Sequence, residues 1–300
     1  MNNIFKNILT LLLFVIICNL SYSQTEKDSL NKKRLITAIS LETGTYAISI
    51  VGLNQIWYKD YAKSSFHWFN DSDEWLQMDK AGHFFTSYYF NEILSAGFRW
   101  SGMERKKAVI PGSIMAFLFI GTIELMDGFS EKWGASWTDL TANTLGITLY
   151  GFQELCWQEQ RILPKYSFSK SGYAAYRPDA LGKNRLEQFI KDYNGQTQWL
   201  SVNIKSFIKT ESFPSWINIA FGYSANGMVS GTDERDYEVY QGPYFDRYRQ
   251  FLLSPDIDFS RIPTKSKFLK TVFNIGKFIK LPFPALEFSQ RKLKGHWGYF

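Results

Sequence analysis

The chain has little cysteine, and it has no long run of lysines and arginines. Its 300 residues include two cysteines, Cys18 and Cys156. If Cys18 leaves with an export signal, no intramolecular disulfide can form, so stability has to come from burial of a core. The formal net charge is +6. This mild surplus, without a basic cluster, argues against nucleic acid as a partner and favours an envelope lipid or protein.

Several motifs that mark common enzymes and binding proteins are also missing. The sequence contains no G-x-S-x-G, no P-loop and no G-x-G-x-x-G, so it gives no sign of a serine-hydrolase elbow or a nucleotide-binding loop. The segment from Asp127 to Asp139 is bounded by acids, but it lacks the inner acids and the central glycine of an EF-hand loop. No local motif therefore names a reaction.

The N-terminal apolar run, Leu11–Ile17, is too short to cross a bilayer, which takes about 20 residues. Lys6 precedes this run, and small or polar residues follow it at 21–23. These are the three parts of a secretory signal. We predict a signal peptide over residues 1–23 and an exported protein of the periplasm or outer membrane, with an uncleaved anchor as the alternative. Bulky residues before Cys18 argue against its lipidation.

Residues 24–163 are expected to form a bundle of about four helices. Apolar residues at helical spacing predict helices over 35–58, 79–100, 111–126 and 136–160. Pro111 suits the first turn of its helix, where the missing N–H costs nothing. Ser136, followed three residues later by Asp139, predicts the N-cap of the fourth helix.

The loop charges argue against insertion of this bundle into the inner membrane. The helix around Pro111 has sixteen uncharged residues, 108–123, which is marginal for a span. With the mature N-terminus outside, spanning helices would leave the basic segments 32–34 and 105–107 outside and the acids of 60–74 inside. That arrangement reverses the positive-inside rule. We therefore expect the bundle to be soluble or to lie on a membrane surface.

Residues 164–300 are expected to form a β-rich antiparallel region with one late helix, which makes the chain an α+β protein. Alternating apolar residues predict strands around 200–204, 217–223 and 250–262, the last broken at Pro255. Asn-Gly at 194–195 and 226–227 predicts type I′ turns, and 267–280 has a helical pattern. The aromatic C-terminus resembles the closing strand of an outer-membrane barrel, which needs at least about eight strands. We expect an ordinary last strand instead.

Three polar pairs stand on otherwise apolar helices, at spacings that put both side chains of a pair on one helix face. They are Asp79 with His83, Glu124 with Asp127, and Asp139 with Asn143, which Gly146 follows one turn later. Helices that pack as neighbours would bring these three faces together. Burying several acids is costly unless a cation, a proton or a metal compensates them, so the set marks a candidate site.

Two interpretations of this set need no metal. In the first, the residues form a structural polar network in which Lys80, Asn143 and Gly146 take part. In the second, His83 is a catalytic general base that Asp79 holds in place, since histidine titrates near neutral pH.

The third interpretation is a divalent metal site. His83, Glu124, Asp127 and Asp139 would be its ligands, because histidine and carboxylates from facing helices are the usual ligands inside a helical bundle. The ion would neutralise the acids and could activate a water molecule.

The order Asp79-Lys80-x-x-His83, Glu124-x-x-Asp127 and Asp139-x-x-x-Asn143-x-x-Gly146 resembles the YfiM-like family of predicted periplasmic proteins of unknown function. The resemblance covers residues 79–151. A looser similarity extends to VanZ-like membrane proteins. YfiM-like proteins are usually predicted to be lipoproteins, and the residues before Cys18 depart from that pattern. Neither resemblance implies a reaction.

Two functions remain open at this point. In the first, the chain is an exported envelope protein with a structural or binding role, whose aromatic and basic surface holds a lipid or a protein. Its 26 Phe, 17 Tyr and 10 Trp fit such a surface, and they also fit a large core. The alternative is a metal-assisted hydrolase or transferase acting on lipid or cell-wall material. Cys156 is expected in the core, and His296 on the surface.

Overall fold

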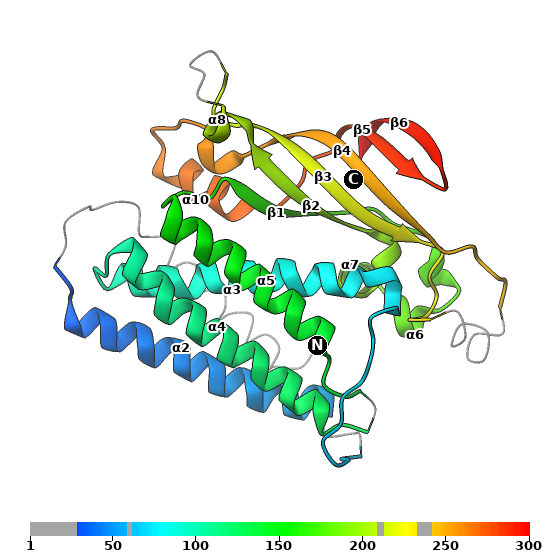
Figure 1. Ribbon diagram of the computed structural model, residues 1–300, viewed down its shortest axis with the longest axis horizontal. Helices are drawn as coiled ribbons and strands as arrows, with labels where there is room; N and C mark the ends of the chain where they lie inside the picture. The colour runs from blue at the N-terminus through cyan, green and yellow to red at the C-terminus, as the bar shows by residue number, and fades with distance from the viewer. Residues whose placement is uncertain (1–28, 59–61, 132, 209–212, 233–241) are drawn as a thin grey trace. The chain divides into compact units, whose positions relative to one another are not determined.

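The computed structural model describes residues 29–300 except 59–61, 132, 209–212 and 233–241 (Figure 1). The predicted signal peptide, 1–23, lies outside the described residues. The chain splits into two compact units. Of the described residues, 29–71 and 86–160 form the first unit, and 72–85 and 161–300 form the second. Helices precede an antiparallel sheet, so the predicted α+β fold is confirmed.

The first unit is helical. Its elements are α2 (Lys32–Leu53), the short π-helix η1 (Asn54–Tyr58), the part of α3 (Met78–Trp100) from residue 86 onward, α4 (Arg105–Gly128) and α5 (Trp137–Cys156). Ser136 caps α5, because its side chain accepts a hydrogen bond from the Asp139 N–H. This confirms the predicted N-cap. Asn31 caps α2 in the same way.

The helices of the first unit pack around small residues. Leu94, Ala116 and Ile147, from three different helices, form its apolar core. Gly112 of α4 lies so close to Ser95 of α3 that a Cβ atom at residue 112 would stand 2.8 Å from the Ser95 backbone nitrogen. The close approach explains why glycine stands at this position.

Two features of the first unit differ from the predictions. α4 begins at Arg105 rather than at 111, so Pro111 lies inside the helix, where its missing N–H leaves the carbonyl one turn earlier without that bond. Cys156 ends α5 and is exposed rather than buried in the core, because Gln153 and Glu154 are the buried residues of this last turn.

Two helices of the first unit are long and apolar enough to cross a membrane, judged by length and composition. They are α2 and α4. Core helices and signal sequences pass the same test, but most of the apolar residues of these two helices are not buried. Ile36 and Val51 of α2 are exposed, and so are Ile114 and Leu118 of α4.

The second unit contains a six-stranded sheet (Figure 1). The strands are β1 (Ile162–Phe168), β2 (Gln196–Asn203), β3 (Ile217–Asn226), β4 (Tyr248–Ile257), β5 (Phe283–Ser289) and β6 (Lys292–Tyr299). They lie in chain order, and each pairs antiparallel with the next. β1 and β6 are therefore the two edges of the sheet.

Short helices connect and flank the strands. They are η2 (Glu74–Gln77), η3 (Tyr173–Ala175), α6 (Pro178–Leu181), α7 (Arg185–Lys191), η4 (Tyr193–Gly195), α8 (Ile204–Phe207), η5 (Phe259–Arg261) and α10 (Lys267–Gly276). Residues 78–85 of α3 also belong to this unit. Met78 packs there with Ala225 and Met228.

The sheet corrects two predictions. β4 is one continuous strand through Pro255. Pro255 is tolerated because β5 pairs only with residues 250–253 of β4, so the strand has a free edge at the proline. Neither Asn-Gly pair forms a type I′ turn, which needs a positive φ at both residues. Gly195 closes a 3₁₀ turn, and at 226–227 only Gly227 has a positive φ.

Candidate functional site

The first unit brings four acids into one region. Glu124 and Asp127 end α4, Asp139 lies in the first turn of α5, and Asp71 comes from the segment before η2. Glu124, Asp71 and the capping residue Ser136 are all buried. The two acids at the end of α4 and the acid on α5 are those that the helical spacing predicted, and Asp71 is an addition.

Hydrogen bonds tie this region to the start of α5. The Ser136 Oγ and the Thr138 Oγ1 both donate to Asp71 Oδ1, each at 2.6 Å. The Ser136 N–H donates to Glu124 Oε2 at 3.3 Å. Helix N-termini favour negative charge, so the carboxylates of Asp71 and Asp139, which lie at the start of α5, gain from the helix dipole. One serine therefore caps the helix and also connects two of the acids.

Glu124 is a buried acid of this region with a raised pKa. Its residue is 6% exposed. Burial, and then the negative charges of Asp139, Asp127 and Asp71, raise its pKa to about 8. The carboxyl is therefore mostly protonated at neutral pH, which reduces the repulsion among the four acids. A divalent cation bound among these oxygens would displace that proton.

Asp127 has a partner of its own. The Tyr58 hydroxyl donates to Asp127 Oδ1 at 2.7 Å. Burial, this hydrogen bond and the nearby negative charges raise the pKa of Tyr58. Tyr58 therefore stays a neutral donor and holds one oxygen of Asp127, which makes Asp127 less available as a ligand than the sequence predicted.

Asp71 is placed by a long-range contact that the sequence did not reveal. The Phe69 N–H donates to the Ala135 carbonyl, and Trp68 pairs with Ala135 in a parallel bridge. The Trp68 and Trp137 rings stack with their centroids 3.9 Å apart. These contacts fix the segment before η2 beside the N-terminus of α5. The signal in the sequence was the run Asn-Asp-Ser-Asp at 70–73, which lies on no helix.

The first polar pair lies in the second unit. Lys80 Nζ bonds Asp79 Oδ2 at 2.8 Å. Burial raises the pKa of Asp79, and the charges of Lys80 and His83 oppose that rise. Lys80 thus pairs with its chain neighbour. The proposed joint action of His83 and Asp79 with the acids of the first unit remains a prediction.

Asn143 and Gly146 are buried on one side of α5. They lie in the first unit together with the acids, which agrees with a packing or network role. A second polar network of this unit was not predicted. In it, Arg105 pairs with Glu154, which also accepts from Gln160 Nε2 at 2.7 Å, while Arg99 Nη1 donates to the Tyr150 hydroxyl at 2.8 Å.

The sheet of the second unit has an apolar outer face. Two rows of side chains cross neighbouring strands there, and all but Tyr223 are exposed. They are Leu200, Phe221, Leu253 and Leu286 in one row and Tyr223, Phe251, Phe288 and Leu293 in the other. The alternate positions of β3, β4 and β5 are buried.

The buried face of the sheet is largely polar. Lys165 forms an ion pair with Asp256 at 2.7 Å, and Ser201 Oγ donates to the same carboxylate at 2.6 Å. Lys280 Nζ lies 3.1 Å from Ser254 Oγ and 5.0 Å from the centroid of the Trp199 ring. Burial lowers the pKa of Lys280 to about 8. Polar groups therefore occupy the side of the sheet that a water-soluble protein fills with apolar ones.

The helix α10, like the sheet, exposes its apolar side and turns polar residues inward. Phe268, Val272 and Ile275 lie on one side of it and are exposed. On the other side Phe273 stacks on Phe259, with the ring centroids 6.1 Å apart, and Lys270 and Lys277 are half-buried. The apolar stripe of this amphipathic helix thus faces away from its own unit.

Residues 67–154 match a family described as "Predicted periplasmic lipoprotein (DUF2279)". The matched segment contains all three polar pairs and Asp71, and it confirms the resemblance to an uncharacterised periplasmic lipoprotein family. The chain is accordingly an exported protein of the cell envelope, of the periplasm or outer membrane. No curated protein and no solved structure matches it. Cys18, the candidate lipid-bearing cysteine, lies outside the described residues, and the similarity to VanZ-like proteins remains a prediction.

Proposed function

We propose that this envelope protein has a binding role at a membrane, and that its second unit attaches to lipid through the outer face of the sheet and through α10. One observation carries the proposal: in β3, β4 and β5 every exposed position except Arg249 is apolar, and the buried positions are mostly polar or small. Antiparallel sheets that face water show the opposite pattern. Lipid-facing sheets alternate with apolar residues outside and polar residues inside.

The size of the exposed patch supports lipid as its occupant. The two rows are continuous across four strands each, through the pairs Phe221 with Leu253 and Phe251 with Phe288. Contiguous apolar patches of this kind are uncommon on soluble monomers. Burying one leucine or phenylalanine side chain contributes about 1.5–3 kcal/mol, so even a few of these residues in lipid give strong attachment.

Charge supports an anionic lipid. Lys265 and Lys267 are exposed beside the apolar side of α10, and the chain as a whole carries net positive charge. Exposed lysines next to inserted apolar residues add about 1 kcal/mol each at an anionic surface. We therefore expect stronger binding to phosphatidylglycerol than to phosphatidylcholine.

Vesicle flotation tests this function. The purified full chain, diluted out of detergent, should float with phosphatidylcholine vesicles and more completely with vesicles that also contain phosphatidylglycerol. The double variant Phe221→Ser/Leu253→Ser should lose at least about tenfold in partitioning. Leu186→Ser is the matched control, since Leu186 is as exposed as Phe221 but lies on α7, outside the rows. A wild-type chain that stays soluble and monomeric without vesicles would refute the proposal.

The acids of the first unit favour a second candidate, a metal-assisted hydrolase or transferase acting on lipid or cell-wall material. Glu124 shares its region with Asp71 and Asp139, and carboxylate oxygens are the ligands that Mg²⁺, Ca²⁺ and Mn²⁺ prefer. In this proposal His83 and Asp79 supply a further ligand or the general base, as the helical spacing predicts.

Metal analysis separates this candidate from a purely structural network. The full chain, dialysed against Mn²⁺ or Zn²⁺, should retain stoichiometric metal, and Glu124→Gln and His83→Ala should each lose it. Glu131→Gln, an exposed acid in the loop before α5, should not. Retention of no metal by the wild-type chain, together with a loss of stability in Glu124→Gln, would leave the network as the role of these residues.

A further inference from the structure

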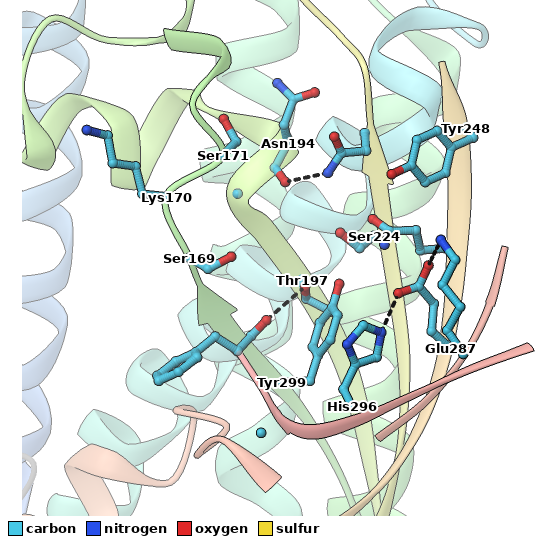
Figure 2. Close-up of a pocket in the computed structure, with 16 residues that line it drawn as sticks. Ser169, Lys170, Ser171, Asn194, Thr197, Ser224, Tyr248, Glu287, His296 and Tyr299 are labelled. Carbon is cyan, nitrogen blue, oxygen red and sulfur yellow. Dashed lines mark hydrogen bonds and ion pairs between the residues drawn. The ribbon is translucent and has the colours of Figure 1, made fainter. Parts of the chain in front are cut away.

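The second unit contains a polar pocket on the side of the sheet opposite the apolar rows. Its volume is about 460 Å³. The start of β2, the end of β3, the start of β4 and both strands of the β5–β6 hairpin line it, together with the segment that follows β1. Figure 2 shows these side chains converging from separate strands. Ser169, Thr197, Ser224, Tyr248, Glu287 and His296 are among them.

Glu287 is the anchor of the pocket. It is 2% exposed. It accepts from Ser289 Oγ at 2.5 Å and bonds His296 Nε2 at 2.7 Å, and Lys294 Nζ lies 3.7 Å away. Although burial opposes ionisation, the hydrogen bonds from Ser289, Gln250 and His296 lower its pKa. A buried carboxylate with this many donors is a fixed acceptor, and it also holds the imidazole in one orientation.

Aromatic groups form the remaining walls. The ring of Tyr299 lies 5.0 Å from the His296 ring and 6.1 Å from the Trp199 ring, between centroids. In Figure 2 the hydroxyl end of Tyr248 faces the same space from the opposite wall. The pocket thus combines a charged acceptor, an imidazole, hydroxyls and ring faces.

We propose that this pocket binds a hydroxyl-rich saccharide. Sugar hydroxyls donate and accept at once, so they fit a wall of carboxylate, imidazole, serine, threonine and tyrosine groups, while the apolar face of a pyranose can pack on the tyrosine rings. The inference goes beyond attachment to lipid, because none of the residues that carry it belongs to the outer rows or to α10.

The carboxylate count favours binding over hydrolysis. Glycosidases use a pair of carboxylates, one of them protonated, on either side of the bond that breaks. Among the described residues that line the pocket, Glu287 is the one with an acidic side chain, and its lowered pKa keeps it ionised. We therefore expect the saccharide to be held unchanged.

Saturation-transfer NMR on the full chain in detergent tests the proposal. The probes are the methyl glycosides of glucose, mannose and N-acetylglucosamine, and inorganic phosphate as a competitor. At least one glycoside should receive saturation, phosphate should not displace it, and Tyr248→Phe should weaken its binding about tenfold. Lys292→Gln is the control, because Lys292 is exposed on β6 outside the pocket lining.

Two variants keep the test independent of folding. Glu287→Gln removes the buried carboxylate and should abolish saccharide binding. It also leaves donors unsatisfied, so its fold is checked by circular dichroism against wild type. Tyr248→Phe removes one hydroxyl and keeps the ring, so it tests the pocket with little risk to the fold. No signal from any of the three glycosides, displacement by phosphate, or wild-type affinity in folded Tyr248→Phe overturns the proposal. Vesicle flotation of both variants should be unchanged, so failure here is distinct from failure of lipid attachment.

Discussion

At the scale of single residues, two buried carboxyl groups of the first unit keep their protons to unusually high pH. Burial raises the pKa of Glu42 on α2 to about 8, and burial with neighbouring acids does the same for Glu124. Both groups have an ordinary value of 4.5 in the unfolded chain. Between these two values the folded unit holds protons that the unfolded chain has released, so rising pH favours unfolding.

This gives a pH prediction with a definite sign. In EDTA, the contribution of Glu42 and Glu124 to the free energy of unfolding should be full at and below pH 4.5, fall as pH rises towards about 8, and level off above it. Glu124→Gln should remove its share of the slope, and Glu42→Gln the rest. Denaturant titrations at several pH values measure the effect. A slope that both variants leave intact would contradict it.

Ser136 gives a second prediction at this scale. Ser136→Ala removes the cap of α5 and the donor to Asp71, so it should cost about 1–2 kcal/mol. Ser136→Thr keeps a hydroxyl in place and should cost little. Thermal unfolding of the two variants checks the difference, and equal stability of both would show that neither bond contributes.

Which residues could be predicted depends on how local their partners are. The cap at Ser136 and the acid pairs on α4 and α5 follow from spacing along one helix, and the structure bears out the cap. Asp71, Glu287 and His296 could not be found in this way, because their partners come from other elements. His296 was expected on the surface, and it instead bonds Glu287 across the β5–β6 hairpin.

At the scale of elements, α10 has one packed side and one exposed apolar side, and the proposal assigns lipid attachment to the exposed side. Phe268 is 74% exposed, whereas Phe273 stacks on Phe259. Phe268→Ser should therefore change stability by less than about 0.5 kcal/mol and weaken vesicle binding several-fold. Phe273→Ser should do the reverse and cost about 1–3 kcal/mol. Thermal unfolding and flotation of both variants separate the two sides, and a large loss of stability in Phe268→Ser would contradict this assignment.

The sequence predicted most of these elements but not their orientation. Alternation along β3 and β4 indicates strands, and it is the same whether the apolar side faces a core or a lipid. The structure distinguishes the two cases, because Phe221 lies beside Leu253 and both are exposed. At Pro255 the sequence predicts a break, because no local pattern shows that β5 ends its pairing before the proline.

At the scale of the whole molecule, the chain passes three times between two units, after Asp71, after Phe85 and after Gln160. Each unit has an interior of its own. No local pattern indicates that residues 72–85 join the second unit, because they carry the start of a helix whose remainder belongs to the first.

Matched glycine variants test whether the units unfold separately. Gly112→Ala would place a Cβ 2.8 Å from the Ser95 nitrogen in the first unit, and Gly222→Ala would place one 2.7 Å from the Trp199 ring in the second. Each should cost about 1–3 kcal/mol. In calorimetry of the detergent-solubilised chain, each variant should lower one transition and leave the other in place. A single transition that both variants shift equally would contradict two separate units.

The pairing of β3 with β4 has a consequence for how the chain matures. Sliding one strand by a single residue would exchange its two faces. If β3 is the strand that slides, the exchanged pairing is the better one in water, since it hydrates Ser224 and hides Phe221. Under the proposed attachment to lipid, the observed alignment is the one that places Phe221 and Phe251 in hydrocarbon. Chain refolded from denaturant without amphiphile is therefore expected to trap misaligned hairpins and precipitate, and adding micelles before dilution is expected to rescue it.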